Sequence, residues 1–355
     1  MNKIVKTLVS ATILALAASS AVSAETVLRF AEATPNRGAR AEAVEQFMTD
    51  VKKLSNGDIG FEMHWGGALL DYKSVTKGVS SGTADLGSML AAYDPKTLRV
   101  VTIGDVPTKY SDPWVGMRAM YELMTTNKEV QGELAKQNLV YVGGFTTTGA
   151  QFECGRDAKI ETIADIKGKR IRAVGYHAKV LSELGANLVN LSQGDTYQAL
   201  DTGLIDCATA YLYAISAFKT YEVANNYTIV NWVPINGFAM LMNLDMWNDL
   251  NKKQQGILRE AGSEMVDFYG KLQIDEMKEV VDGLRSGSIG RKVSVHEMSQ
   301  EEHSKLDKAG EKYAKDWVGY MNKDGVDGQK IWDQYEGLLA KYQAELDAKG
   351  YPWKR

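Results

Sequence analysis

Cysteine, histidine and proline are scarce in this sequence. Its 355 residues include two cysteines, four histidines and six prolines. No two histidines have the i, i+4 spacing of a zinc-binding helix and none lies near a cysteine, so we expect no metal site. The G-x-G-x-x-G and Walker A phosphate loops are also absent, and we expect no cofactor.

An excess of basic charge is missing as well. Lys and Arg together number 41 against 45 Asp and Glu, which gives a formal net charge of −4, and no basic block occurs. Proteins that bind nucleic acid present a basic surface to the phosphates, so we expect no nucleic-acid partner. The 24% of charged and 45% of hydrophobic residues are typical of a globular chain and exclude a disordered one.

Long hydrophobic runs are absent except at the N-terminus. Lys3 and Lys6 precede an uncharged apolar stretch at residues 7–20, and the small residues Val22-Ser23-Ala24 follow. This order is typical of an export signal cleaved after Ala24. A retained anchor is the weaker alternative, because the stretch is shorter than the roughly 20 residues that span a bilayer. The mature protein, from Glu25, is therefore expected in the periplasm.

The two cysteines have a different meaning in an oxidising compartment than in the cytosol. Cys154 and Cys207 have no CxxC spacing and no histidine cluster beside them, which indicates a disulfide between them. Two free thiols or a redox-active pair are the alternatives, but neither cysteine lies in a motif that lowers a thiol pKa.

Hydrophobic periodicity predicts an α/β chain that restarts near residue 149. Strands and helices alternate from residue 27, and a second α/β unit follows the first. From residue 247 the pattern is almost wholly helical, with a long helix expected at 249–284. Strands are predicted at 27–31, 59–65, 84–91, 100–103, 139–143, 151–154, 169–174, 187–191, 205–209, 227–233 and 238–242.

A serine motif of hydrolases occurs in the wrong context. The segment GVSSG at 78–82 matches the G-x-S-x-G form with Ser80 as nucleophile. A nucleophile elbow lies between a strand and a following helix, whereas here the pattern predicts a helix before and a strand after. We therefore expect no catalytic residue, and the glycines are explained by a helix end.

Arg172 is the strongest candidate for ligand binding. It ends the predicted strand KGKRIR (167–172), in which Arg170 and Arg172 share one face. In two-lobed α/β proteins the ligand crevice lies outside the carboxyl ends of the strands, where a guanidinium can bind a carboxylate or sulfonate through two hydrogen bonds. Arg170 is explained equally well by the protein surface. The nearby Tyr211, Tyr213 and Tyr221 either line a cleft or pack in the core.

Eight short motifs, in order and over nearly the whole mature chain, resemble a transporter family. They are LRF (28–30), GGALL (66–70), GTADL (82–86), GDVP (104–107), IADIKGKRIR (163–172), LGAN (184–187), YQALDTGLID (197–206) and MNLDMW (242–247). Together they resemble the solute-binding proteins of TRAP (tripartite ATP-independent periplasmic) transporters, of the C4-dicarboxylate-binding type.

The resemblance implies a two-lobed periplasmic binding protein fold, type II-like, with a long helix spanning both lobes. It implies lobe I at 25–148 plus 238–279, and lobe II with the C-terminal helices at 149–237 plus 280–355. A small organic anion would bind between the lobes and pass to the small and large permease subunits in the membrane. The family's carboxylate-binding arginine corresponds to Arg172.

The family pattern is altered elsewhere. Ala208-Thr209-Ala210 replaces a usual Gln-Glu-Asn, so Thr209, Tyr211 or Tyr213 is expected to shape that wall. Gln193 replaces a frequent aromatic, and residues 149–153 lack the second arginine of sialic-acid-binding members. These departures argue against a dicarboxylate or sialic acid as the ligand, and leave Arg172 as the one arginine expected to bind it.

Glu32 corresponds to a position that approaches the ligand in ectoine-binding relatives. Opposite Arg172, it would suit an anion that also bears an amino or hydroxyl group. Glu32 could equally cap the following helix or pair with Arg37 or Arg40. Trp65, Tyr93 and Asn236 are further candidates, from loops that line the cleft in this family.

The preferred interpretation is thus a receptor without a catalytic step, in which ligand binding shifts an open–closed equilibrium. A periplasmic module that presents its ligand to a sensor is an alternative with the same ligand site. A secreted hydrolase is a third, and depends on Ser80 alone.

Overall fold

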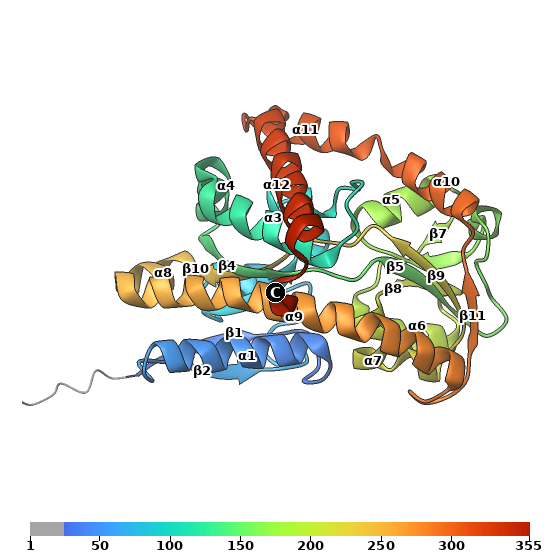
Figure 1. Ribbon diagram of the computed structural model, residues 1–355, viewed down its shortest axis with the longest axis horizontal. Helices are drawn as coiled ribbons and strands as arrows, with labels where there is room; N and C mark the ends of the chain where they lie inside the picture. Colours follow the sequence, from blue (N-terminus) through green and yellow to red (C-terminus); the bar gives the residue numbers. More distant parts are fainter. Residues whose placement is uncertain (1–24) are drawn as a thin grey trace, which may run out of the picture.

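The computed structural model describes residues 25–355, so the predicted signal peptide at 1–24 lies outside the described residues. The described chain forms two β-sheets that lie beside each other with helices around them (Figure 1). We call the part built on the five-stranded sheet lobe I and the part built on the six-stranded sheet lobe II. No helix of residues 25–355 is long and apolar enough to cross a membrane.

The sheet of lobe I is mixed. Its strands are β1 (Thr26–Ala31), β2 (Ile59–His64), β3 (Leu86–Leu90), β4 (Leu139–Phe145) and β10 (Phe238–Asn243). They lie in the order β2-β1-β3-β10-β4, with β1 parallel to β2 and β3, and β10 antiparallel to β3 and β4. β10 therefore enters this sheet from a distant part of the chain, between two strands of the first α/β unit.

The sheet of lobe II is mixed in the same way. Its strands are β5 (Ala150–Gly155), β6 (Arg170–Arg172), β7 (Asn187–Leu188), β8 (Cys207–Ala210), β9 (Ala224–Trp232) and β11 (Ser294–Glu297). The order is β11-β9-β5-β8-β6-β7, and β5 runs antiparallel to both neighbours. The α/β fold predicted from periodicity is confirmed, and β5, the first strand of this sheet, begins at Ala150.

Two short linkers join the lobes and contact each other. One runs from β4 to β5 and the other from β9 to β10. The Thr147 backbone N–H donates to the Ile235 carbonyl (3.0 Å), and the Ile235 N–H donates to Thr147 Oγ1 (2.8 Å). The two linkers thus run beside each other and are hydrogen-bonded, which is an arrangement that can serve as a hinge.

Helices cover both sheets. Around lobe I lie α1 (Ala39–Leu54), α2 (Val75–Ser80), α3 (Pro113–Thr126), α4 (Lys128–Ala135) and α8 (Leu244–Asp249), and in lobe II lie α5 (Gly175–Glu183), α6 (Thr196–Thr202) and α7 (Leu212–Phe218). Short 3₁₀ turns include η1 (Ala91–Tyr93), η2 (Val101–Asp105), η3 (Ile163–Ile166), η4 (Gln193–Asp195), η5 (Thr220–Glu222) and η6 (Pro352–Lys354).

The helix α9 (Lys252–Ser286) runs along both lobes (Figure 1). Its 35 residues span about 50 Å at roughly 1.5 Å per residue. Asn251 and Gln254 form a capping box at its start, and Gly287 ends it in a left-handed conformation (φ 86°). It contacts α1, α3 and β4 in lobe I, and α7 and β11 in lobe II. The predicted long helix is therefore confirmed.

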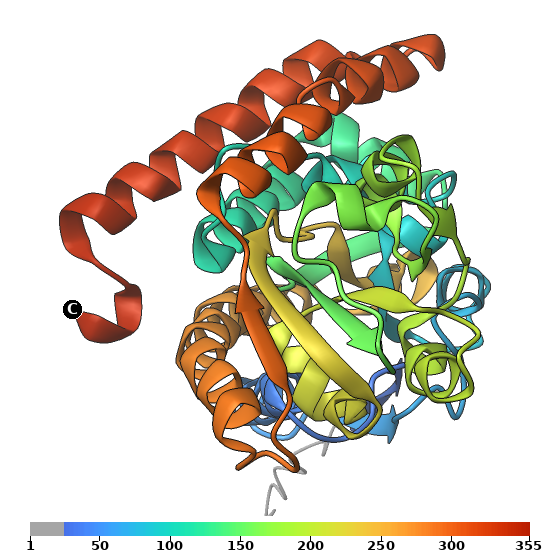
Figure 2. The same cartoon turned by 90° about the vertical axis from the view of Figure 1, so that its right-hand side faces the viewer.

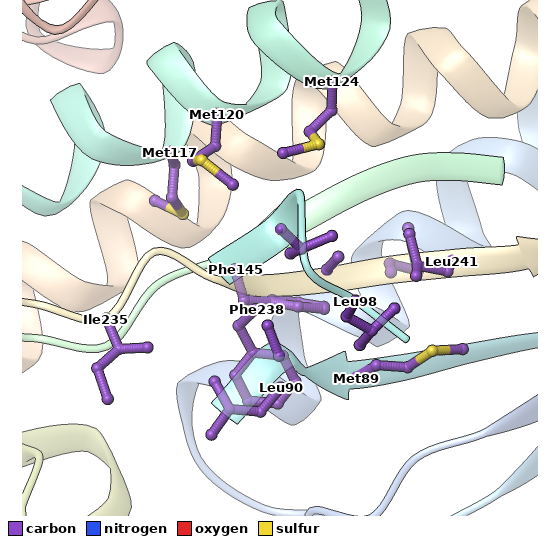
Figure 3. Close-up of a cluster of buried hydrophobic side chains, with 14 of the residues drawn as sticks. Met89, Leu90, Leu98, Met117, Met120, Met124, Phe145, Ile235, Phe238 and Leu241 are labelled. Carbon is purple, nitrogen blue, oxygen red and sulfur yellow. The ribbon is translucent and has the colours of Figure 1, made fainter. Parts of the chain in front are cut away.

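A methionine stripe of α3 packs on the sheet of lobe I. Met117, Met120 and Met124 have the i, i+3, i+7 spacing of one helix face, and all are buried. Figure 3 shows them above the strands that carry Phe145 and Phe238. These two rings meet edge to face with centroids 5.7 Å apart. The packing holds both rings in place at the ends of β4 and β10, next to the linkers.

The C-terminal helices cross the outside of both lobes (Figure 2). They are α10 (Gln300–Gly310), α11 (Tyr313–Lys323) and α12 (Gly328–Lys349). α10 contacts α5 and β9 of lobe II, whereas α12 contacts α3 of lobe I. Between them, the buried Trp317 donates from Nε1 to Thr102 Oγ1 (3.0 Å). The chain end thus packs on both lobes, and the residue boundaries given above for the lobes stay a prediction.

Two local predictions are wrong. Residues 100–103, expected as a strand, lie at the 3₁₀ turn η2, because a short buried apolar run has no periodicity to separate strand from helix. The region after residue 247, expected to be almost wholly helical, contains β11, which pairs with β9 in parallel.

Ser80 ends α2 and donates from its hydroxyl to the Gln137 carbonyl (2.7 Å), so the local structure is that of a helix end.

The predicted disulfide is confirmed. Cys154 and Cys207 are directly opposite each other on β5 and β8, and they form a disulfide. They are 53 positions apart in sequence. The bond therefore closes a long loop that contains β6 and β7, and it ties β8, the strand beside β6, to β5.

Glu153, next to Cys154, is a fully buried carboxyl in lobe II. Its Oε2 accepts hydrogen bonds from Thr220 Oγ1 (2.5 Å) and Tyr227 Oη (3.4 Å), and its Oε1 has no partner among the described residues. Burial raises the pKa of Glu153 to about 7, although Thr220 and the charge of Arg172 act in the opposite direction.

We expect the double variant Cys154→Ser/Cys207→Ser to fold with a lower free energy of unfolding. A cross-link over this separation stabilises by about 4 kcal/mol in the chain-entropy model, because it restricts the unfolded chain. Denaturant unfolding of both proteins measures the difference. Mass spectrometry of unreduced wild-type protein is the companion test, and two free thiols there would contradict the disulfide.

The variant Glu153→Gln should gain stability over the wild type as pH rises. The pKa of Glu153 is about 7 in the folded chain against 4.5 for the free side chain, so ionisation above pH 4.5 favours the unfolded state. Melting temperatures of ligand-free proteins from about pH 5 to pH 8 should diverge by a few degrees in favour of the variant. Parallel curves would show that Glu153 keeps an ordinary pKa.

Candidate functional site

A small cavity lies between the lobes. Its wall combines groups of lobe I, the linkers and lobe II, namely Tyr72, Leu90, Tyr93, Thr147, Arg172, Val174, Gln193, Tyr211, Tyr213 and Phe238. Its volume is about 20 Å³, which is room for about one water molecule. Tyr93 and Val174 also border a hollow of about 570 Å³ on the outer surface. The cavity therefore lies between the lobes and next to this surface hollow.

Arg172 reaches this cavity from the end of β6. The preceding Ile171 is buried on the other face of the strand, and Arg170 lies at the surface in an ion pair with Asp206 (2.5 Å). Arg172 is 1% exposed. Its Nε donates to the Leu191 carbonyl (3.2 Å), and its Nη1 donates to Gln193 Oε1 (2.8 Å). The described chain provides no carboxylate in an ion pair with it.

Tyr93 connects the two lobes at Arg172. This tyrosine ends η1 of lobe I, and its hydroxyl oxygen accepts from Arg172 Nη2 (2.7 Å) and from the Gln193 backbone N–H (2.9 Å). Gln193 begins η4 of lobe II. One oxygen thus receives two donors that point into the cavity, and a ligand carboxylate oxygen could accept from the same pair.

Two stacked tyrosines form the wall beside Arg172. Tyr211 and Tyr213 flank the start of α7, and their rings lie 6.4 Å apart and nearly parallel, at 18°. The Tyr211 hydroxyl has no hydrogen-bond partner among the described residues. Thr209, also predicted for this wall, is fully buried on β8 but does not line the cavity. The structure therefore brings Tyr211 and Tyr213 to the cavity, and leaves Thr209 behind them.

Glu32 is fully buried just beyond the end of β1. Its backbone is held at the end of β2 by hydrogen bonds with His64 and Gly67. Its Oε1 accepts from the Thr34 N–H (2.9 Å), and its Oε2 has no partner among the described residues. It neither caps α1, whose N-cap residue is Gly38, nor forms an ion pair with Arg37 or Arg40 in the described chain.

Arg40 is a second buried arginine that the sequence analysis did not place in the site. It is 1% exposed on the first turn of α1, and its guanidinium lies 3.6 Å from the centre of the Phe238 ring. Its Nη2 donates to the Tyr213 hydroxyl (3.0 Å). Nothing in the sequence indicated that Arg40 is buried, because a charged residue at the start of an amphipathic helix is normally exposed.

Trp65 and Asn236 do not line the cavity. Trp65 follows β2 and is half-buried against the core of lobe I. Asn236 lies in the linker from β9 to β10, where its Oδ1 accepts from Thr146 Oγ1 (2.6 Å) and its backbone N–H donates to the Gly104 carbonyl (2.8 Å). Asn236 thus holds the linker to lobe I.

One guanidinium group, that of Arg172, and tyrosine hydroxyls line the cavity, and Arg40 lies behind Tyr213 and Phe238. Residues 25–355 contain no cluster of metal-ligating side chains. A buried guanidinium favours an anionic partner, because an unpaired buried charge is costly. The candidate site therefore consists of Arg172, Tyr93, Gln193, Tyr211, Tyr213 and Tyr72, with Arg40 and Glu32 next to it.

Known proteins with this fold are numerous. The chain is similar in structure to a TRAP solute-binding protein from Rhodoferax ferrireducens T118, solved in complex with copurified benzoate. The TM-score is 0.78 at 20% identity, over 90% of this chain and 99% of that chain. This likeness confirms the two-lobed periplasmic binding protein fold.

Sequence relatives point to the same family. The C4-dicarboxylate-binding periplasmic protein DctP of Rhodobacter capsulatus is 24% identical over 315 residues, which are 85% of this chain and 90% of the relative. A solute-binding protein of Chromohalobacter salexigens is 23% identical over 227 residues, which are 63% of this chain and 66% of the relative. The model of DctP, the bacterial extracellular solute-binding protein family 7, matches residues 30–319. The chain therefore belongs to family 7 of the bacterial extracellular solute-binding proteins, which are binding proteins and not enzymes.

Proposed function

We propose that the protein is the extracytoplasmic receptor of a TRAP transporter, and that it binds a small organic anion, a carboxylate or sulfonate, between its lobes. With its predicted signal peptide, it would act in the periplasm and deliver the ligand to the small and large membrane permease subunits. Two similar proteins, from Rhodobacter capsulatus and Rhodoferax ferrireducens, are named or solved with carboxylates.

The observation that carries this proposal is the environment of Arg172. All three of its nitrogens donate to neutral oxygens, and its side chain is buried. Burying a guanidinium without an anion is expensive, so the site gains most from a ligand that brings the missing negative charge. Both terminal nitrogens retain a second hydrogen for such a ligand.

Ligand binding and lobe closure are coupled in this geometry. Arg172 and Gln193 belong to lobe II and Tyr93 to lobe I, and all three meet at one point of the cavity. A carboxylate held by Arg172 and touched by Tyr93 would contact both lobes only in the closed form. It would therefore shift the equilibrium toward closure, which is the form that a permease can recognise.

A thermal-shift screen tests the function. Mature protein, refolded after denaturing extraction to remove any copurified ligand, is screened against carboxylates, sulfonates, amino acids and sugar acids. We expect one acid class to raise the melting temperature by mass action, with one molecule bound per chain by calorimetry and no turnover. No shift with any acid, and no acid in the denaturing extract, would contradict the proposal.

Replacing Arg172 with Ala should remove most of the affinity for that acid. Loss of a buried charge-assisted pair costs about 2–5 kcal/mol, which is roughly 30-fold or more in dissociation constant. Arg170→Ala is the matched control, because Arg170 lies on the same strand but faces solvent and Asp206. Calorimetric titration of both variants measures the effect. A loss below tenfold for Arg172→Ala would remove this residue from the site.

A further inference from the structure

Arg40 and Glu32 carry unpaired polar atoms in one buried cluster of lobe I. Arg40 Nε and Nη1 and Glu32 Oε2 have no hydrogen-bond partner among the described residues. Both side chains are at least 99% buried. A guanidinium keeps its proton in proteins, so Arg40 is charged although it is buried. Unpaired buried donors and acceptors are rare in folded proteins because each is costly.

This cluster lies directly behind the cavity wall. Arg40 stacks on Phe238 and donates to Tyr213, and both of these residues line the cavity. On the other side, Glu32 binds Thr34, whose hydroxyl is hydrogen-bonded to the cavity residue Tyr72 (2.9 Å). The unpaired atoms are therefore one layer from the space that a ligand enters.

The contact of Arg40 mirrors the contact of Arg172. Arg172 of lobe II donates to Tyr93 of lobe I, and Arg40 of lobe I donates to Tyr213 of lobe II. Each arginine thus uses a tyrosine hydroxyl of the opposite lobe as its acceptor. When the lobes part, both arginines lose that acceptor together and face the open cleft.

The charges of Arg40, Glu32 and Arg172 limit the charge of the ligand. Arg40 and Arg172 contribute two positive charges and Glu32 one negative charge, so the sum is about +1. Glu153, near Arg172, would lower the sum toward zero if ionised. With Glu153 protonated, one ligand carboxylate balances the sum of about +1, whereas a second would leave an uncompensated buried negative charge.

We propose that Arg40 is a second ligand-binding residue, and that the ligand is a monocarboxylate whose far end is an uncharged polar group, accepting from Arg40 and donating to Glu32. This rests on the proposed function, with the carboxylate at Arg172. An amide or a hydroxyl has the required acceptor and donor, whereas a carboxylate has no donor and an alkyl group has neither.

Matched ligands test the proposal on the wild-type protein. Succinamate, succinate and butyrate share a four-carbon chain and differ in having an amide, a second carboxylate or a methyl group at the far end. Glutaramate, glutarate and valerate repeat the comparison one carbon longer. We expect the amide acid to bind roughly tenfold or more tightly than its two partners in at least one series, by calorimetry. A diacid that binds tightest, or an alkyl acid that binds equally well, would overturn the proposal.

Two variants then test whether Arg40 and Glu32 cause the preference for the amide acid. Arg40→Gln should weaken amide-acid binding roughly 10- to 100-fold and reduce its advantage over the alkyl acid. Glu32→Gln should improve the diacid relative to the amide acid, because the site loses a negative charge. Arg29→Gln is the control, since Arg29 lies on β1, which ends just before Glu32, but pairs with Asp85 and does not line the cavity (2.9 Å). An unchanged preference in both folded variants would refute the role of Arg40.

The outcomes separate this proposal from the proposed function. If neither series binds, but another acid binds and depends on Arg172, the assignment of Arg40 fails and the receptor function stands. If no acid of any class binds, the receptor function itself fails. Should Arg40→Gln not fold, the wild-type ligand series and Glu32→Gln still decide.

Discussion

Two buried guanidinium groups, each bound to a tyrosine of the opposite lobe, are the constraint around which this protein is built. A buried arginine without a carboxylate is costly, so every element near Arg172 and Arg40 has to supply acceptors or aromatic faces. Tyr93 and Gln193 do so for Arg172. Phe238, Phe145 and Tyr213 do so for Arg40. Arg40 Nε and Nη1 have no hydrogen-bond partner among the described residues.

The rest of the fold keeps these side-chain contacts in position. β6 delivers Arg172 to the cleft, and the disulfide ties β8, its neighbour, to β5. The methionines of α3 hold the strands that carry Phe145 and Phe238. Two hydrogen-bonded linkers cross between the sheets, while α9 and the C-terminal helices pack on both lobes. Such a frame can hinge at the linkers and still return the same residues to the same cavity.

Some elements of the fold could be predicted from the sequence, and others could not. The strands of the first α/β unit were predictable because each alternates or is apolar over its own length. Residues 100–103 and β11 were not, since a short buried run does not reveal its own conformation and β11 depends on its pairing with β9. Trp65 and Asn236 were assigned by resemblance to loops, and the structure places them against lobe I and in the linker instead.

The amino-acid sequence by itself determined the α/β alternation, the long helix, the disulfide, the family and the place of Arg172 at a strand end. These depend on local periodicity, on composition and on motifs whose members are close in the chain. Only the tertiary structure decided that Tyr93 meets Arg172 and that Arg40 is buried against Phe238 and Tyr213. Arg40 and Tyr213 are 173 positions apart. No local pattern encodes such a contact, because it exists only when two lobes fold and close on each other.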